Sequence, residues 1–125
     1  MGLINYDVPL INKYMNANIK ANILSDDEMK KLGFTSNTGK TWYFCKKVAN
    51  DWGISFNISI NKNDKSVEIE ILDEAFCQPC DYQSSLRKTR NKLLINIHNN
   101  VQEIMKYLMD NNNYLWIYIR RLYLR

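Results

Sequence analysis

The sequence predicts an α+β fold: a three-stranded antiparallel β-meander with one face covered by helices, in the order ααβββαα. Three observations lead to it. Residues 54–72 alternate apolar and polar side chains on both sides of a polar turn, which is typical of a β-hairpin. A similar alternation precedes the hairpin over residues 41–48, and an apolar stripe at helical spacing follows it over residues 86–110. With 125 residues, we expect one domain.

The hairpin supplies the apolar face around which the other elements are expected to pack. Its turn, residues 61–64, is rich in Asn and Asp, which tolerate left-handed backbone and bond locally. A hairpin alone is marginal in water, so helices must cover its apolar face. The side chains expected on that face are Ile54, Phe56, Ile58, Ile60, Val67, Ile69 and Ile71.

Two helices are predicted before the sheet. Pro9 is suited to the first turn of a helix that extends to about residue 23. Ser25 and Glu28 have capping-box spacing and predict a second, short helix. That helix should end near Leu32, with Gly33 as its left-handed cap.

The first strand is expected to show one apolar and one exposed face. Its alternation sends Trp42, Phe44 and Val48 to the inner face, and the other face should carry Tyr43, Cys45 and Lys47. Residues 50–53 should turn this strand into the hairpin.

A long helix over residues 86–110 is the predicted lid for the sheet. Ser84 or Ser85 can cap it, and three asparagines at residues 111–113 should end it. For residues 114–125 helix and strand patterns compete, and we choose helix. The stripe of the lid consists of Leu86, Leu93, Leu94, Ile97, Val101, Ile104, Met105 and Leu108.

Composition and local hydropathy favour a cytoplasmic protein that does not enter a membrane. No stretch approaches the roughly 18–20 apolar residues that a membrane helix needs. The N-terminus lacks a basic region followed by an apolar run, so we expect no secretory signal. Three cysteines, an odd number, fit a reducing compartment better than a disulfide framework.

Charge is distributed unevenly along the chain. Residues 1–83 carry 9 Lys and Arg against 11 Asp and Glu, whereas residues 84–125 carry 8 against 2. A basic cluster crowds the start of the predicted lid helix, where the helix dipole disfavours cations. It either pairs with acidic residues of the preceding segment or binds an anionic partner, such as nucleic acid or an acidic protein surface. The cluster consists of Arg87, Lys88, Arg90 and Lys92.

Cys77 and Cys80 form a Cys-x-x-Cys motif, which resembles the redox motif of thioredoxin-like proteins. In such proteins a helix N-terminus lowers the pKa of the first thiol. The strand–helix–strand unit expected before that motif is missing here, and Pro9 is the only proline outside it. A zinc site is a further alternative, with the ligand set Cys45, Cys77, Cys80 and His98.

Residues 54–83 resemble small proteins of phages and prophages of low-GC Gram-positive bacteria, a group without an assigned activity. The shared pattern is an Ile-Ser-Phe-Asn strand, an acidic and apolar second strand, and a segment close to Leu-Asp-Glu-x-Phe-x-Gln-Pro-x-Asp-Tyr-Gln. An aromatic residue often stands at the position of Cys80 in that pattern. The resemblance therefore implies that the Cys-x-x-Cys spacing is incidental, and it implies a phage setting.

We therefore predict a non-catalytic binding protein, with inhibition of its protein partner as one outcome. No nucleophile-and-base pattern or phosphate-binding loop supports an enzyme, and we expect no cofactor. Nucleic acid bound by the basic, aromatic C-terminal third is the alternative, and a homodimer is also considered. The predicted binding residues are Asp73, Glu74, Asp81, Tyr82, Arg87, Lys88, Arg90 and Lys92.

Overall fold

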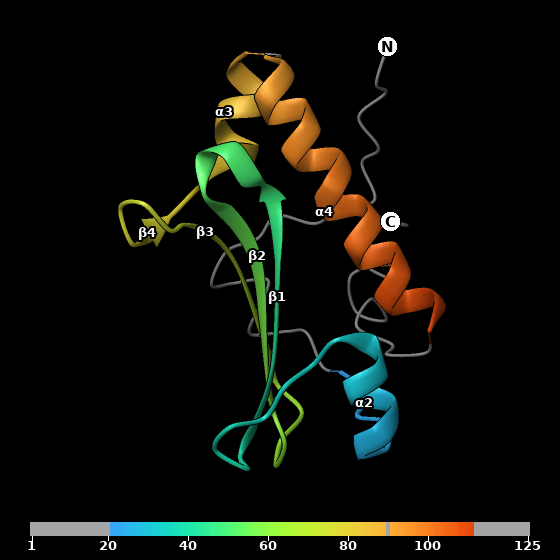
Figure 1. Ribbon diagram of the computed structural model, residues 1–125. Coiled ribbons are helices and arrows are strands. Elements are labelled where there is room, and N and C mark those ends of the chain that lie inside the picture. The colour runs from blue at the N-terminus through green and yellow to red at the C-terminus, as the bar shows by residue number, and fades with distance from the viewer. Residues whose placement is uncertain (1–20, 90, 112–125) are drawn as a thin grey trace.

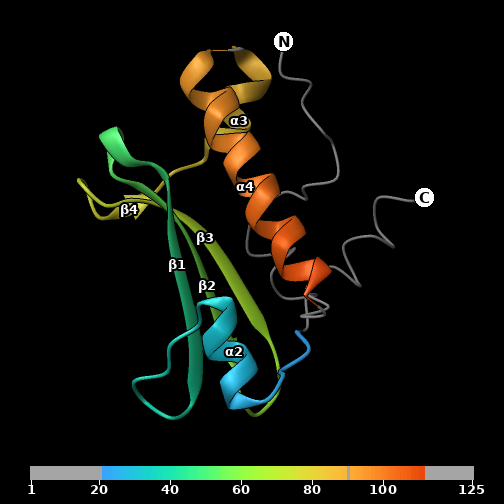
Figure 2. The same ribbon diagram turned by 45° about the vertical axis from the view of Figure 1, so that its right-hand side comes forward.

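The computed structural model describes residues 21–89 and 91–111 of the chain. In these ranges it has an α+β fold with an antiparallel sheet in the strand order β1-β2-β3-β4. Figures 1 and 2 show α2 and α4 on the same side of this sheet, with α3 beside the start of α4. The elements are α2 (Asp26–Leu32), β1 (Thr41–Ala49), the 3-10 helix η1 (Asn50–Trp52), β2 (Ile54–Asn61), β3 (Val67–Asp73), β4 (Gln78–Pro79), α3 (Tyr82–Lys88) and α4 (Lys92–Asp110).

The predicted hairpin is confirmed as β2 and β3. Phe56 pairs with Ile71 and Ile58 with Ile69, so apolar residues face one another across the two strands. The seven side chains expected on the apolar face are all buried, none more than 7% exposed. On β1 the inner residues Trp42, Phe44 and Val48 are also buried, and the alternate residues are exposed as predicted.

The turn between β2 and β3 differs from the expectation in one detail. Asn61 Oδ1 accepts the N–H groups of Asn63 (2.8 Å) and Asp64 (3.3 Å), as local bonding by Asn predicts. The left-handed residue, however, is Lys65, with φ of 62°, and not an Asn or Asp. The Lys65 N–H donates to the Asn61 carbonyl (2.9 Å), so the chain reverses at the last loop residue before it re-enters the sheet.

The sheet has four strands, so the predicted three-stranded meander was incomplete. β4 is only two residues long and lies between the predicted hairpin and the predicted lid helix, where no strand was expected. It pairs antiparallel with the end of β3, Leu72 with Pro79 and Asp73 with Gln78. A strand this short carries no detectable alternation, and proline is confined to sheet edges because it has no N–H to donate.

The prediction of one lid helix over residues 86–110 was wrong, because two helices cover this range. Thr89 is extended (φ −149°, ψ 137°) and ends α3. Two side-chain caps begin separate helices: Asp81 Oδ1 accepts the Ser84 N–H (3.1 Å), and Asn91 Oδ1 accepts the Leu94 N–H (3.1 Å). The cap of α3 is therefore Asp81 and not Ser84 or Ser85.

The apolar stripe of the lid was predicted correctly even though the helix is divided. Its residues in α4, from Ile97 to Leu108, are buried against the sheet, while Leu93 and Leu94 are partly buried. Leu86 is buried from α3. The helix ends at Asp110, where the Asn111 side chain donates to the Tyr107 carbonyl (2.8 Å), as the asparagine run predicted.

The short helix α2 has the predicted caps. Ser25 Oγ accepts the Glu28 N–H (3.3 Å), and its hydroxyl donates to Glu28 Oε1 (2.9 Å), so the glutamate reaches the hydroxyl of the cap. Gly33 ends the helix in the left-handed conformation, with φ of 112°.

The helix predicted over residues 9–23 does not extend as far as residue 23. Residues 21–25 are not helical, and the Ala21 N–H donates to the Lys65 carbonyl (3.0 Å). The rest of that helix, and the helix chosen for residues 114–125, lie outside the described residues.

Three hydrogen bonds fix the helices to one another and to the sheet. The Asn100 side chain on α4 donates to the Val48 carbonyl on β1 (2.9 Å). The Tyr107 hydroxyl donates to the carbonyl of Leu32 at the end of α2 (3.3 Å). Between α3 and α4, the buried Tyr82 hydroxyl lies 3.0 Å from His98 Nδ1. These bonds orient α4 over the inner face of β1.

In the part of the chain that the structure describes, every helix is too short or too polar to cross a lipid bilayer.

Replacing Phe56 by alanine is expected to lower the free energy of unfolding by about 3–5 kcal/mol. The side chain is fully buried in the central strand pair and meets the Phe44 ring edge-on (centroids 6.5 Å apart). Urea unfolding monitored by circular dichroism measures the change. Glu68→Ala, on the exposed face of β3, is the control and should stay within about 0.5 kcal/mol of the wild type. A loss below about 1 kcal/mol for Phe56→Ala would contradict this core.

Candidate functional site

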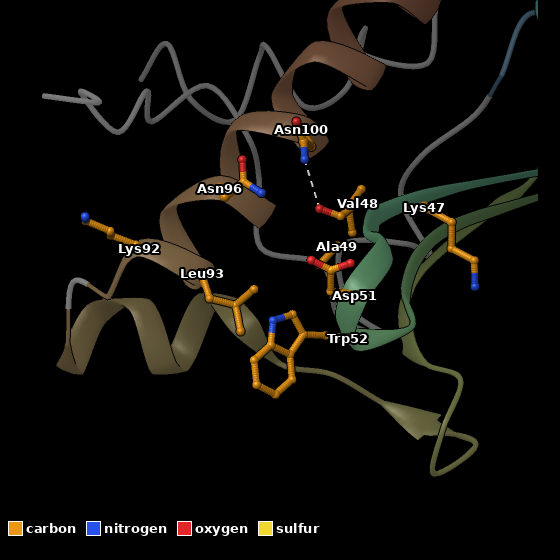
Figure 3. Close-up of a pocket in the computed structure, with 9 residues that line it drawn as sticks. All are labelled: Lys47, Val48, Ala49, Asp51, Trp52, Lys92, Leu93, Asn96 and Asn100. Carbon is orange, nitrogen blue, oxygen red and sulfur yellow. Dashed lines mark hydrogen bonds between the residues drawn. The ribbon is translucent and has the colours of Figure 1, made fainter.

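A pocket of about 600 Å³ opens between the end of β1, η1 and the first half of α4 (Figure 3). Pockets that hold ligands or partner side chains commonly fall in the range of about 300–1,000 Å³. The lining residues are Lys47, Val48, Ala49, Asp51, Trp52, Lys92, Leu93, Asn96 and Asn100. We call this pocket the groove.

Local irregularities in the chain create the groove. A register shift between Lys47 and Ala49 bends β1 where it leaves the sheet. The chain then forms η1, and Gly53, with φ of 64°, turns it back into β2. The bond from Asn100 to the Val48 carbonyl joins α4 to the bend at one end of the groove, as Figure 3 shows.

The groove combines apolar walls with amines at its ends. In Figure 3 the Trp52 ring lies beside Leu93, while Lys47 and Lys92 extend away from each other on opposite sides. Trp52 is 63% exposed, although tryptophan is a large side chain that folding usually buries. The walls at Trp52 and Leu93 suit an apolar side chain of a ligand. Lys92 provides a positive charge beside them, whereas Lys47 is paired with Glu74 and Asp51 adds a carboxylate.

A second exposed aromatic lies in the neighbouring turn. Phe76, between β3 and β4, is 73% exposed. Asp73 Oδ1 accepts the N–H groups of Ala75 (3.1 Å) and Phe76 (3.4 Å) and so shapes this turn. The Glu74 N–H donates to the Gly53 carbonyl (2.8 Å), which holds the two turns together. Trp52 and Phe76 thus project from adjacent turns at one end of the sheet.

The three acidic residues predicted as binding residues all have structural partners. Asp73 shapes the β3–β4 turn, and Glu74 forms an ion pair with Lys47. Asp81 caps α3. Tyr82 is 1% exposed and bonds within the core, so its side chain is not accessible to a partner. These residues are close together in the sequence, and in the structure their side chains make contacts within the protein.

The two residues of the basic cluster that lie in α3 do not pair with these acids. Arg87 and Lys88 are exposed, and within residues 21–89 and 91–111 neither forms an ion pair with Asp73, Glu74 or Asp81. Arg87 instead donates to Ser84 Oγ on its own helix (3.2 Å). Lys92 lines the groove. Arg90 lies outside the described residues.

Of the two cysteines of the Cys-x-x-Cys motif, Cys80 lacks the environment of a reactive thiol. Both precede α3, and the residue that caps this helix is the negatively charged Asp81. Burial raises the pKa of the Cys80 thiol, the charges of Asp73 and Asp81 raise it further, and a hydrogen bond from the Tyr82 backbone opposes them. Cys77 is exposed, and its backbone is left-handed (φ 51°). A lowered thiol pKa, which redox catalysis needs, is therefore not produced at Cys80.

The alternative zinc ligands are not brought together. His98 is 4% exposed on the inner side of the sheet, where its Nδ1 bonds with Tyr82. Cys45 is exposed and alternates with the buried Phe44, so it lies on the opposite face. Among the described residues, no group of three or more His, Cys, Asp or Glu side chains is placed to hold a metal ion.

The groove residues Trp52, Leu93, Asn96 and Asn100 were not predicted as site residues from the sequence. The sequence contained one signal for Trp52. It stands between Asp51 and Gly53 in a predicted turn, where it does not continue the buried face of the preceding strand. The asparagines carry no such signal, because their role depends on how α4 crosses β1.

The chain matches no family model, no curated protein and no solved structure.

Alkylation of the cysteines is expected to separate Cys77 from Cys80. Iodoacetamide reacts with the thiolate, so the raised pKa and partial burial of Cys80 should make it react several-fold more slowly than Cys77 at neutral pH. The Cys80 rate should also keep rising to higher pH than that of an ordinary thiol. Peptide mapping by mass spectrometry measures both rates, and the urea-unfolded protein, in which the rates should converge, is the control. Faster labelling of Cys80 at neutral pH would contradict this description.

Proposed function

We propose that this chain is a non-catalytic protein that binds another protein through the groove and the exposed aromatics beside it. The observation that carries the proposal is Trp52, which is 63% exposed at the groove and faces the apolar Leu93. A phage or prophage setting, a cytoplasmic location and inhibition of the partner belong to the same proposal.

The exposed aromatics have the character of an interface centre. A few residues carry most of the affinity in protein interfaces, and tryptophan and tyrosine are enriched among them. Trp52 and Phe76 project from turns that are bonded to each other through Glu74 and Gly53. Lys92 lines the groove, and the exposed Arg87 and Lys88 add positive charge in the last turn of α3, which lies beside the start of α4 (Figure 1). Apolar anchors with a charged rim favour a protein partner.

The chemistry of the groove supports binding more than catalysis. Its nine lining residues include one carboxylate, Asp51, and no His, Cys or Ser. Asn100 donates one side-chain bond to the Val48 carbonyl, which fixes its position in the groove. A nucleophile with an adjacent base is the usual requirement for covalent catalysis, and the residues described here do not place one in the groove.

Trp52→Ala is expected to abolish capture of the partner. Losing an interface tryptophan costs about 2 kcal/mol or more, which is about a thirty-fold loss of affinity. Tagged protein would be used for capture from cells of the native host, followed by quantitative mass spectrometry. The matched control is Tyr43→Ala, an exposed aromatic on the outer face of β1. If the Trp52→Ala variant captures the same partner as well as the wild type and the Tyr43→Ala control do, the groove is not the binding site.

Nucleic-acid binding is the second candidate function. It is favoured by Arg87 and Lys88, which are exposed near the groove and do not form ion pairs with the acidic residues around them in the described ranges. Exposed aromatics next to cations can stack bases while the cations contact phosphates. The aromatic tail that contributed to this prediction lies outside the described residues.

If nucleic acid is the ligand, a gel shift with single-stranded DNA should weaken steeply as salt increases, because phosphate contacts release counterions. The double variant Arg87→Glu and Lys88→Glu should then lose binding and show a shallower salt dependence. The control is Lys30→Glu with Lys31→Glu, the same charge change in the last turn of α2. No shift at low salt, or an equal loss in both double variants, would exclude this candidate.

A further inference from the structure

The free edge of β1 has an open stretch between two contacts that close it. At one end, Tyr43 and Thr35 exchange both backbone hydrogen bonds (2.7 and 2.8 Å), which adds the chain's own residue to the sheet. The residues before Thr35 do not continue this pairing along β1, because Gly33 is left-handed and belongs to the end of α2. At the other end, Asn100 occupies the Val48 carbonyl. Residues 45–47 lie between these contacts.

Cys45 and Lys47 turn their backbone polar groups toward this open stretch. In an antiparallel ladder, alternate residues bond to the same neighbouring strand. Tyr43 bonds to Thr35 on the outer side, so the residues two and four positions further along also present N–H and C=O groups to that side. Over residues 21–89 and 91–111, no segment forms a backbone bond with Cys45 or Lys47 there. Within the described ranges, four hydrogen-bonding groups therefore remain open to an added strand.

The side chains along the stretch favour a negatively charged strand. Lys46 and Lys47 are both exposed, and alternation directs them to opposite faces of the sheet. Glu74 pairs with Lys47, whereas Lys46 and Lys92 form no ion pair within the described ranges. Lysines on an edge also discourage pairing with another copy of the same edge, because like charges would face each other. An acidic segment would instead place opposite charges next to these lysines.

The open stretch leads directly into the groove. Lys47 belongs to both, and the groove continues along Val48 and Ala49 to Trp52. A strand advances about 3.3 Å per residue, so a segment paired at Cys45 and Lys47 would bring its next residues to the groove. One extended segment could therefore form backbone bonds at residues 45–47 and place its next side chains in the groove.

We infer that residues 45–47 of β1 take up an extended, acidic segment of the protein partner as an added strand, with an apolar side chain next to it in the groove. This inference rests on the proposed function and specifies the form of its partner. Main-chain bonds supply affinity in this mode of recognition, and side-chain pockets supply specificity.

Backbone methylation of a probe peptide tests the added strand directly. The probe is a fluorescein-labelled decapeptide that alternates glutamate and valine and ends in leucine, and fluorescence anisotropy measures its binding to the full chain. Two versions carry N-methyl groups on alternate amides, either the odd set or the even set. Only one set can face β1, so one version should bind at least ten-fold more weakly and the other should bind like the parent.

Charge reversal in the protein gives the complementary measurement. Lys46→Glu should weaken binding of the parent peptide about five-fold, and a peptide with lysine in place of glutamate should not bind to the wild type. Lys31→Glu, an exposed basic residue of α2, is the matched control and should leave binding unchanged. Circular dichroism verifies that both variants are folded.

Three results would overturn the inference. Equal effects of both methylated sets would show a charged contact without strand addition, and no binding of the parent peptide would exclude the acidic strand. Binding of a short oligothymidylate with the same sensitivity to Lys46→Glu, in place of the peptide, would assign the edge to nucleic acid. Because partner capture through Trp52 is measured separately, each of the first two results leaves the groove proposal standing, and failure of that capture would remove the proposal itself.

Discussion

Burial of one face of the β2–β3 hairpin is the constraint on which the rest of the structure depends. Seven apolar side chains on this face leave water together, and a hairpin cannot bury them without a second layer. The stripe of α4 provides that layer, with Ile97, Val101 and Leu108 completely buried against it. The other described elements either extend this contact or connect its parts.

A one-sided core has consequences for the rest of the sheet. The outer face stays polar, with Glu68 and Glu70 exposed on β3, and both sheet edges remain near solvent. The edge at β4 is short and contains Pro79, which limits further pairing there. The edge at β1 is nine residues long and is closed only in part. Among the described residues, the helical layer thus leaves the outer face of the sheet and part of the β1 edge uncovered.

Polar contacts decide how the helical layer is placed. Tyr82 and His98 form a buried hydrogen bond that joins α3 to α4, and Asn100 joins α4 to the bend in β1. A buried polar group without its partner is costly, so these bonds favour one orientation of α4 over others with similar apolar contact. In this orientation the first turns of α4 form one wall of the groove, opposite the end of β1 and η1 (Figure 3).

The local pattern of the sequence determined the strands, the apolar stripe and the caps of α2, because alternation, helical spacing and capping act between near neighbours. It did not determine the division of the lid into α3 and α4, since Asp81 and Asn91 compete as caps with Ser84 and Ser85, and only the packing of both helices selects them. The two-residue β4 was beyond pattern analysis because its pairing depends on β3. The groove and the open edge of β1 were decided by tertiary structure alone: they depend on where α4 crosses a strand more than forty residues earlier in the chain, a distance over which local preferences carry no information.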